Sequence, residues 1–455
     1  MDRTVAGGWR VMFLGEAAKA LNGQLAGRDC LFSAVTTDSR TIAGGELFIA
    51  LRGPHFDGHH FLPEIIGKGA SGAVVELGVE TDLPLIEVTD TLAGLGELAA
   101  YWRKRFSIPI VAVTGSNGKT TVKEMVGAIL GKAGPGLVAY GNLNNHIGLP
   151  LSLLRLRKGD TYAVVEMGMN HSGEIAHLTS LAKPTVAVIN NAAPAHLEGL
   201  GSVADVARAK AEIIEGLDSD GTVVINADDH FFGLWREASG ERRIISFGTH
   251  PEADVYWEWD QSSRLKLHTP LGEDTFCFPL PGDHNAINAA AAAAAAIAAG
   301  ATLDSVVAGL KKSRFVPGRL ERKQGVHGCE IWDDSYNANP DSLAAALQVI
   351  SKREGEKILV LGDMRELGST SNQHHQEAGK AAKRAGVSRL YTLGTTSGEA
   401  TQAFGQGACH FSDIDELIEA LRKSLSSSAV VLVKGSRGMT MERVVSAIDN
   451  ARGGG

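Results

Sequence analysis

The strongest chemical signal in the sequence is a glycine-rich turn that ends in a lysine and two threonines. The segment Val113–Thr121 reads Val-Thr-Gly-Ser-Asn-Gly-Lys-Thr-Thr and lies between an apolar run and a helical pattern. Glycines let the backbone curl so that its N–H groups face a phosphate, and a helix start adds partial positive charge. Lys119 can reach the β- and γ-phosphates of a nucleotide, and the Thr120 hydroxyl can ligate Mg²⁺. The segment therefore predicts a triphosphate site, with a plain glycine-rich turn as the alternative.

Two further apolar runs end in side chains suited to bind a metal. Tyr162–Glu166 ends in a carboxylate, and Thr185–Ile189 is followed by a polar loop that contains His196. In open α/β sheets ligands bind beyond the carboxyl ends of the strands, so we expect both side chains near the phosphate loop. Glu166 can join Thr120 and phosphate oxygens around Mg²⁺. Taken singly, a strand-end glutamate is solvated and a lone histidine is structural, so this interpretation depends on the phosphate loop.

Lys210 lies on the next predicted helix among small apolar residues. Its default interpretation is a lysine whose stem packs on the protein while its ammonium reaches water. The sequence shows no Ser-His-Asp or Cys-His arrangement and no G-x-G-x-x-G motif, so covalent catalysis and a dehydrogenase are not indicated. ATP itself is the expected activating reagent.

These residues require a sheet with helices on both faces to hold them. Between Ile108 and about Phe315, apolar strand-like runs alternate with helical patterns, which predicts a buried parallel sheet. The expected strands are Ile110–Val113, Tyr162–Glu166, Thr185–Ile189 and Thr222–Asn226, and the expected helices are Lys119–Lys132, Gly173–Leu181 and Val203–Gly216. Alternating polarity then predicts a small antiparallel insertion, followed by an alanine-rich helix after Asp283. The strands of the insertion are Val255–Trp259, Arg264–His268 and Thr275–Leu280.

Strand and helix patterns also occur before residue 108 and after residue 315. Because roughly 100–200 residues form one domain, the chain is predicted to be an α/β protein of three domains. The predicted domains are residues 1–107, a central P-loop ATPase-like domain of residues 108–315, and a Rossmann-like α/β domain of residues 316–455. The first should contain strands Glu46–Ala50, Gly72–Glu76 and Leu85–Val88 and a helix near Leu92–Arg105. The last should contain strands Ile331–Asp334, Ile358–Leu361, Arg389–Leu393 and Val430–Val433 and helices Ser342–Lys352, Gln376–Ala385, Asp415–Ser424 and Met441–Ala451.

The composition is that of a protein that acts on small molecules. The 455 residues are 44% hydrophobic and carry a formal charge of −8, without a Lys/Arg-rich run, so nucleic acid is not an expected partner. The longest apolar stretch, Ala286–Ala299, is too short and too weakly hydrophobic for membrane insertion. The four cysteines are far apart and no signal peptide is recognised, which favours a cytoplasmic location.

Several motifs together resemble the Mur ligase superfamily, which also contains the folylpolyglutamate synthetases. They are the phosphate loop, Glu166, His196-Leu-Glu, the run Val-Ala-Arg-Ala-Lys-Ala-Glu that ends at Glu212, and Gly282-Asp-His-Asn-Ala-Ile-Asn288. The segments Gly141–Pro150 and Asp333–Pro340 are similar to those of the branch that adds D-alanyl-D-alanine. Asp38-Ser39-Arg40 and Asp57-Gly58-His59 are similar to motifs shared with the branch that adds the third peptide residue. The likeness runs in order through all three predicted domains.

The resemblance implies a ligase that uses ATP and two Mg²⁺ ions. The implied partners are UDP-N-acetylmuramoyl-tripeptide as acceptor and D-alanyl-D-alanine as amine, joined through an acyl phosphate in a cytoplasmic step of peptidoglycan precursor synthesis. The first domain would bind the UDP-sugar, the middle domain ATP, and the last domain would close over the amine. A monomer is expected. Hinges near Pro109 and Pro317-Gly318 suit domain closure.

The resemblance also implies roles that spacing alone does not assign. Lys210 would be carbamylated and would hold a second Mg²⁺ with His196. The implied catalytic residues are Lys119, His196 and Lys210, and the implied metal ligands are Thr120, Glu166, His196 and Lys210. The implied ATP contacts include the phosphate-loop residues Gly115, Ser116, Asn117, Gly118, Lys119, Thr120 and Thr121. Asn285 and Asn288 would contact the adenine, Arg319 the phosphates and Asp334 the ribose. The implied substrate contacts are Ser39, Arg40, Asn142, Asn145, Asn337 and Asn339.

Some of these residues keep a structural interpretation, and two other functions remain open. Asn285 and Asn288 lie on one helix face but can also be helix caps. Arg319 can form a surface ion pair, and the loop Lys434–Arg437 has no assigned role. The rival functions are a sister ligase with another acceptor or amine, including the folate type, and a nucleotide-gated binding protein without ligase activity. The segments 141–150 and 333–340 favour the D-alanyl-D-alanine ligase.

Overall fold

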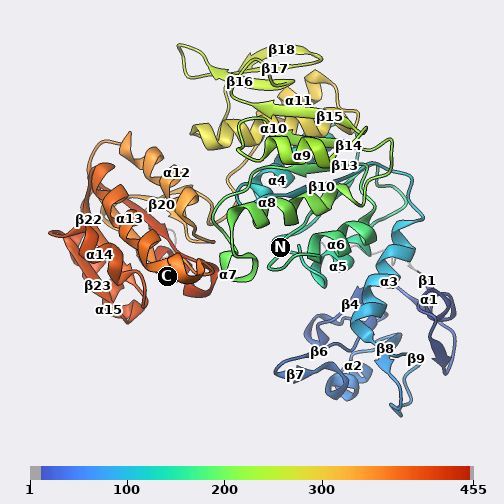
Figure 1. The fold of residues 1–455 in the computed structure, drawn as a ribbon. Helices are drawn as coiled ribbons and strands as arrows, with labels where there is room; N and C mark the ends of the chain where they lie inside the picture. Colours follow the sequence, from blue (N-terminus) through green and yellow to red (C-terminus); the bar gives the residue numbers. More distant parts are fainter. Residues whose placement is uncertain (1–11, 451–455) are drawn as a thin grey trace.

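The computed structural model describes residues 12–450 and contains a separate large β-sheet in each third of the chain (Figure 1). The N-terminal sheet has five strands, the central sheet nine and the C-terminal sheet six. Helices pack against all three sheets, and parallel pairs predominate. The predicted fold class, α/β in three parts, is confirmed.

The N-terminal part is a sheet of order β2-β9-β8-β5-β4 in which only β2 is antiparallel to its neighbour. Helix α3 leaves this part, begins at the capping carboxylate of Asp90, and packs on α5 and α6 of the central part. Its apolar residues join one core shared by both parts. The elements are β1 (Met12–Phe13), α1 (Leu14–Ala20), β2 (Gln24–Ala26), β3 (Leu31–Phe32), β4 (Val35–Thr36), β5 (Leu47–Ile49), β6 (Arg52–Gly53), β7 (Phe56–Asp57), α2 (Leu62–Gly67), β8 (Gly72–Glu76), β9 (Leu85–Val88) and α3 (Thr91–Arg103).

The central sheet has the order β11-β12-β10-β13-β14-β15-β16-β17-β18, and its strands are parallel as far as β16. Along β10 successive side chains enter two different cores, as expected for a strand covered on both faces. The strands are β10 (Ile110–Thr114), β11 (Leu137–Val138), β12 (Ala163–Glu166), β13 (Val186–Ile189), β14 (Thr222–Asn226), β15 (Arg243–Gly248), β16 (Val255–Trp259), β17 (Leu265–Thr269) and β18 (Gly272–Phe276).

Helices α4, α10 and α11 cover one face of this sheet, and the other face carries α5, α6 and α8 (Figure 1). The alanine-rich helix α10 is almost wholly buried, because its small side chains allow the helix to lie close to the sheet and to α4. The helices are α4 (Lys119–Leu130), α5 (Gly148–Leu153), α6 (Glu174–Ala182), α7 (Leu197–Leu200), α8 (Val203–Ala211), α9 (Phe232–Ala238), α10 (Asp283–Ala298) and α11 (Leu303–Leu310).

The predicted antiparallel insertion is part of the central sheet. β16 pairs with β15 in parallel, and β17 and β18 then extend the same sheet in antiparallel pairs. The last strand is Gly272–Phe276, not Thr275–Leu280, because the hairpin turns at Gly272 (φ +121°) and the chain leaves the sheet before Pro279. β15 and α9, which connect β14 to this edge, were not predicted.

The C-terminal sheet has the order β19-β20-β24-β21-β22-β23, with only β19 antiparallel. Separate apolar cores lie on its two faces, and the predicted strands and helices are present, together with the unpredicted β19, β23 and α14. The last helix was predicted to end at Ala451, which lies outside the described residues, but it ends at Ile448 because Asp449 has an extended backbone. The elements are β19 (Glu321–Gln324), β20 (Glu330–Asp334), α12 (Pro340–Ser351), β21 (Glu356–Gly362), α13 (Ser371–Arg384), β22 (Val387–Leu393), α14 (Gly398–Phe404), β23 (Ala408–Phe411), α15 (Ile414–Ser424), β24 (Ala429–Lys434) and α16 (Glu442–Ile448).

Two further predictions concern the whole molecule. All four cysteines are free, as their spacing predicted. Among residues 12–450, no helix is both long and apolar enough to cross a membrane.

Candidate active site

The phosphate loop connects β10 to α4 and is shaped by close packing against two asparagines. Gly118 lies at φ +79° immediately before α4, and a side-chain carbon at this position would collide with Asn190 and Asn288. Only glycine combines this left-handed backbone with so close an approach. The turn therefore opens directly onto the N-terminus of a 12-residue helix, where partial positive charge favours an anion.

The ammonium of Lys119 lies within this turn. Its Nζ donates a hydrogen bond of 2.6 Å to the carbonyl oxygen of Gly115. Burial lowers the pKa of Lys119, while the nearby carboxylate of Glu166 raises it and Arg319 lowers it further. A cation that rests on a backbone carbonyl in this position can exchange that partner for a phosphate oxygen.

Thr120 and Glu166 meet at the carboxyl edge of the central sheet. Thr120 Oγ1 donates to Glu166 Oε2 at 2.8 Å, and Asn144 Nδ2 donates to Glu166 Oε1 at 2.8 Å. Thr120 and Glu166 are 4% and 2% exposed. Glu166 ends β12, and Thr120 lies in the first turn of α4, which follows the parallel neighbour β10, so both side chains lie at one edge of the sheet. A buried hydroxyl and carboxylate side by side are a ligand pair of the kind that Mg²⁺ prefers.

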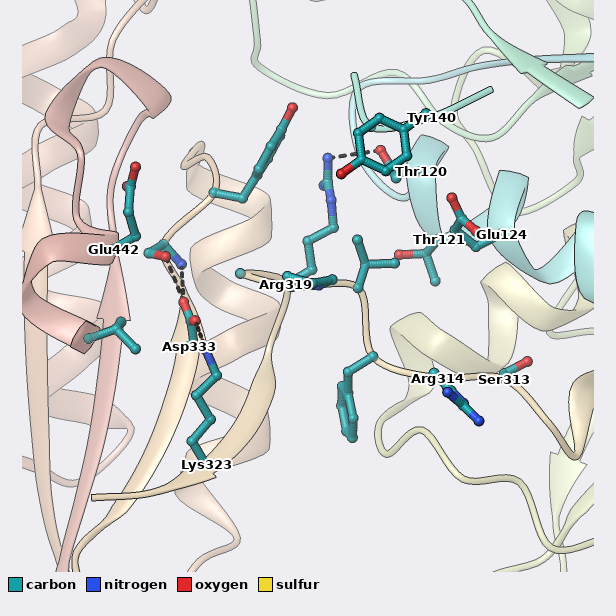
Figure 2. Close-up of a pocket in the computed structure, with 18 of the residues that line it drawn as sticks. Thr120, Thr121, Glu124, Tyr140, Ser313, Arg314, Arg319, Lys323, Asp333 and Glu442 are labelled. Atoms are coloured by element: carbon teal, nitrogen blue, oxygen red, sulfur yellow. Dashed lines mark hydrogen bonds and ion pairs between the residues drawn. The ribbon is translucent and has the colours of Figure 1, made fainter. Parts of the chain in front are cut away.

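Arg319 reaches the phosphate loop from the segment that joins the central and C-terminal parts (Figure 2). Its Nη2 donates to Thr120 Oγ1 at 3.0 Å, and its Cζ lies 4.3 Å from the centroid of the Tyr336 ring. Arg437 lies over the same ring with its Cζ at 5.7 Å. The aromatic ring thus holds Arg319 by a cation–π contact while the guanidinium faces the loop.

Asparagine side chains connect the loop to α10 and α12. Asn190 Nδ2 donates to Asn117 O and to Asn288 Oδ1, both at 2.9 Å, and Asn191 Oδ1 accepts from Asn117 N at 2.8 Å. Asn339 Nδ2 donates to Asn117 Oδ1 at 2.8 Å, and Asn339 Oδ1 caps α12. Asn288 and Asn339, which were predicted to contact ligands, are therefore also structural supports of the loop.

His196 and Lys210 come from the elements that follow β13. His196 has a left-handed backbone (φ +58°), and its Nδ1 lies 2.7 Å from Oε2 of Glu366 in the C-terminal part. Lys210 is 2% exposed. Burial lowers its pKa well below the usual value, Lys119 lowers it further, and Asp229 opposes the shift. Within residues 12–450, the Lys210 ammonium makes no hydrogen bond.

The nucleoside end of the predicted site contains Asp334, Asn285 and His284. Asp334 Oδ1 accepts from Leu320 N at 3.1 Å, and Asp334 Oδ2 forms a buried ion pair with Lys434. Asn285 Nδ2 donates to the backbone carbonyl of Pro281 at 2.8 Å. Burial lowers the pKa of His284 to about 4, so this imidazole is neutral at neutral pH.

Two cavities meet at Arg319. The first, of about 610 Å³, is lined by the phosphate loop, Glu166, His196, Asn285, Asn288 and Asp334. The second, of about 800 Å³, lies between α4, the connecting segment 312–319 and the β19–β20 side of the C-terminal part (Figure 2). Thr121, Gly318, Arg319, Tyr336 and Arg437 line both cavities. The first cavity thus gathers most of the predicted phosphate, metal and nucleoside residues. Thr120 lines only the second cavity, and Gly115 and Lys210 line neither of the two.

The predicted substrate residues fall into two groups. Asn142, Asn145, Asn337 and Asn339 line the first cavity. Ser39 and Arg40 line neither cavity: Ser39 Oγ donates to Glu64 at 3.3 Å, and Arg40 pairs with Asp38 on the surface of the N-terminal part.

The sequence interpretation assigned no role to several residues of this site, namely Asn144, Asn190, Asn191, Asp229, Glu366 and Lys434. Asn190 and Asn191 directly follow β13 and Lys434 ends β24, so their position at strand ends was a usable signal. Asn144 stands in a run of three polar residues whose individual directions no spacing rule decides. Glu366 comes from a different sheet, and no local pattern links it to His196.

All three parts of the chain match domain models of one family. Residues 31–103 match the model described as Mur ligase family, catalytic domain, residues 113–296 the Mur ligase middle domain, and residues 318–437 the Mur ligase, glutamate ligase domain. These matches have the same order along the chain as the three sheets.

Individual relatives are similar over nearly their whole length. The UDP-N-acetylmuramoyl-tripeptide–D-alanyl-D-alanine ligase of Escherichia coli (strain K12) is 43% identical over 96% of this chain and 98% of its own. The enzyme of the same name from Bacillus subtilis (strain 168) is 35% identical over 90% and 92%. A crystal structure of MurF from Acinetobacter baumannii superposes with a TM-score of 0.89 at 35% identity, covering 95% of this chain and 97% of that one. MurF ligase from Thermotoga maritima in complex with ADP gives a TM-score of 0.79 at 27% identity, covering 91% and 96%.

With three domain models matched in sequence order and a relative 43% identical over nearly its full length, the chain belongs to the Mur ligase family.

Proposed function

We propose that this ligase joins D-alanyl-D-alanine to UDP-N-acetylmuramoyl-tripeptide and converts ATP to ADP and phosphate. The relatives named for this reaction support the choice of substrates, and the ADP complex of the Thermotoga maritima relative supports the nucleotide. The observation that carries the proposal in this chain is the group around Thr120: a helix start, the carboxylate of Glu166 and the guanidinium of Arg319 converge on one hydroxyl.

The side chains of the first cavity fit a nucleotide triphosphate and Mg²⁺. Lys119, Arg319 and the start of α4 supply positive charge for the phosphates. In the described part of the chain, no three His, Cys, Asp or Glu side chains form a complete metal cage. This suits Mg²⁺, which takes one or two protein oxygens and completes its shell with water and phosphate oxygens. We assign Thr120 and Glu166 to the first ion.

A second Mg²⁺ would be held by His196 and by Lys210 as its carbamate. Burial lowers the pKa of the Lys210 amine and so favours the form with a free lone pair, and an amine in this form adds CO2, with loss of a proton, to give an anionic, carboxylate-like ligand. A carbamate resonance in ¹³C NMR after equilibration with ¹³C-bicarbonate, absent from a Lys210→Ala variant, would support this assignment, and its absence from both proteins would rule it out. Bound Mg²⁺ ions neutralise charge on the transferring phosphoryl group.

The reaction then follows from position and charge. A carboxylate oxygen of the acceptor peptide attacks the γ-phosphorus of ATP, ADP leaves, and an acyl phosphate is formed. Lys119 and Arg319 offset the negative charge that gathers on the phosphoryl oxygens, and this kind of electrostatic stabilisation is the main source of catalysis in phosphoryl transfer. The amine of D-alanyl-D-alanine next adds to the activated carbonyl, and the tetrahedral intermediate expels phosphate to leave the amide.

The three parts would divide the substrates among them. Residues 1–107 would bind the UDP-sugar with Ser39 and Arg40, and residues 108–315 would bind ATP and, through Asn142 and Asn145, the acceptor peptide. Residues 316–455, with Asn337 and Asn339, would close over the amine. We further propose a cytoplasmic monomer, which light scattering of the pure protein and fractionation of cells would test.

A coupled assay of phosphate release tests the substrates directly. We expect release only when acceptor, ATP and D-alanyl-D-alanine are all present, with glutamate inactive as the amine. Equal release with glutamate would assign the chain to a sister ligase reaction. If the protein binds the nucleotide but releases no phosphate with any combination of acceptor and amine, it is a nucleotide-binding protein without ligase activity.

A further inference from the structure

Glu366 of the C-terminal part contacts His196 of the central part. It lies between β21 and α13, and its Oε2 is 2.7 Å from His196 Nδ1. Backbone groups reinforce the contact, because Glu198 N donates to Glu366 O at 3.4 Å. The contact joins two residues that are 170 positions apart in sequence.

The segment before Glu366 is fixed at each residue. The carboxylate of Asp363 accepts from the backbone of the β22–α14 turn, at 2.9 Å from Thr395 N and 2.8 Å from Ser397 N. Met364 N donates to the fully buried His375 at 2.9 Å, and Arg365 N donates to Ser436 Oγ at 2.8 Å. The carboxylate of Glu366 is therefore presented by a rigid segment and not by a free loop.

The backbone on both sides of the contact has an uncommon conformation. His196 and Glu366 lie at φ +58° and +65°, a region that costs a residue with a side chain roughly 1–2 kcal/mol. Such conformations persist where the surrounding structure fixes them, and they cluster at functional sites. The pairing of two left-handed residues across an interface indicates a contact held for its geometry.

The chemistry of the pair determines which nitrogen of His196 is available. A carboxylate only accepts hydrogen bonds, so the 2.7 Å approach of Glu366 Oε2 favours the tautomer with the proton on Nδ1 and the lone pair on Nε2. His196 lines the first cavity together with Lys119 and Glu166. Metal-binding histidines commonly donate their other ring N–H to a carboxylate, which fixes the orientation of the ring and makes it a better ligand.

We propose that Glu366 is a positioning residue: by holding Nδ1 of His196, it prepares Nε2 to bind the second metal ion, so that docking of the C-terminal part completes the metal site of the central part. This inference rests on the proposed function, which places a metal at His196. It predicts that metal affinity depends on a residue that does not touch the metal.

The test measures Mn²⁺ binding in the presence of ADP, from the electron paramagnetic resonance signal of the free ion. The proteins are the wild type, His196→Ala, Glu366→Ala, Glu366→Gln and the double variant His196→Ala/Glu366→Ala. Glu377→Gln is the control, because Glu377 is an exposed carboxylate of the same part. We expect Glu366→Ala to weaken one of the Mn²⁺ sites by about 10–100-fold. Glu366→Gln should lose less Mn²⁺ affinity than Glu366→Ala, because its amide oxygen can still accept a hydrogen bond from Nδ1. The control Glu377→Gln should bind Mn²⁺ as tightly as the wild type.

The double variant separates a positioning role from a general structural one. If Glu366 acts through His196, the double variant binds Mn²⁺ no more weakly than His196→Ala, since the two effects are not additive. Unchanged affinity in Glu366→Ala, additive losses in the double variant, or wild-type affinity in His196→Ala would each overturn the inference. The proposed function is judged separately, by amine-dependent phosphate release from the wild-type enzyme.

Discussion

Arg319 Nη2 donates a 3.0 Å hydrogen bond to Thr120 Oγ1 across 199 positions of sequence. The same hydroxyl donates to Glu166, so one threonine stands between a cation from the connecting segment and an acid from β12. Because the connecting segment leads into the C-terminal part, this contact ties the position of that part to the phosphate loop.

The first prediction concerns Tyr336, whose ring holds Arg319. Tyr336→Leu removes the cation–π contact and should raise the KM for ATP or lower kcat by about 2–30-fold, the range that corresponds to roughly 0.5–2 kcal/mol. Tyr336→Phe keeps the ring face and should stay within about twofold of the wild type. Steady-state kinetics with ATP as the varied substrate decide the matter. Equal losses in both variants would assign the effect to the hydroxyl and not to the ring.

Lys119→Ala should abolish turnover while the fold is kept. The Lys119 ammonium lies within the phosphate loop, and loss of one preorganised charge of this kind costs about 100- to 1,000-fold or more in kcat. Lys132→Ala, an exposed lysine just beyond the other end of α4, is the matched control. Circular dichroism and phosphate release are the measurements. A folded Lys119→Ala protein with near-normal rate would remove the loop from the mechanism.

Asn144 and Asn142 should respond differently to the same substitution. Asn144→Asp places a second carboxylate against Glu166, where the amide donates now, and should change the Mg²⁺ concentration needed for half-maximal rate by about 10-fold or more. Asn142 lines the same cavity, but it is Asn144 that donates to Glu166, so Asn142→Asp should change mainly the KM for the acceptor. Rates measured over a range of Mg²⁺ at saturating acceptor separate the two. An identical Mg²⁺ dependence in the wild type and Asn144→Asp would contradict the assignment of Glu166 to the metal.

His284 should make the protein sensitive to acid. Burial lowers its pKa from 6.5 to about 4, so between these values the unfolded chain binds more protons and the free energy of unfolding rises with pH. His284→Asn removes this contribution. Relative to the wild type, the variant should be more stable at pH 4.5 than at pH 7 by about 2–3 kcal/mol, measured by urea unfolding. A difference that does not change with pH would show that His284 titrates normally.

The parts of the site that could be predicted from the sequence are those encoded locally. The phosphate loop needs Gly118 at φ +79° directly before a helix. The residue types of a single nine-residue segment, Val113–Thr121, are sufficient to predict this turn. Glu166 and His196 follow strands of one parallel sheet, so alternation of strands and helices was sufficient to place them at one edge.

The parts that could not be predicted depend on contacts between distant elements. In the segment 142–145, which contains three asparagines, the spacing does not decide which asparagine turns inward, and it is Asn144 that reaches Glu166. The pairing of Glu366 with His196 depends on how two sheets dock. β16 joins the central sheet through its parallel pairing with β15. The alternation of polar and apolar residues does not reveal this partner, so the sequence predicted an insertion separate from the parallel sheet.

The central claim is that ATP activates the acceptor carboxylate as an acyl phosphate, and isotope transfer tests it most directly. Acceptor labelled with ¹⁸O in both oxygens of the reacting carboxylate is converted with ATP and D-alanyl-D-alanine, and the products are analysed by mass spectrometry. The account predicts one ¹⁸O in each inorganic phosphate released and one in the new amide carbonyl. Unlabelled phosphate, with the label in AMP or retained wholly in the peptide, would contradict it.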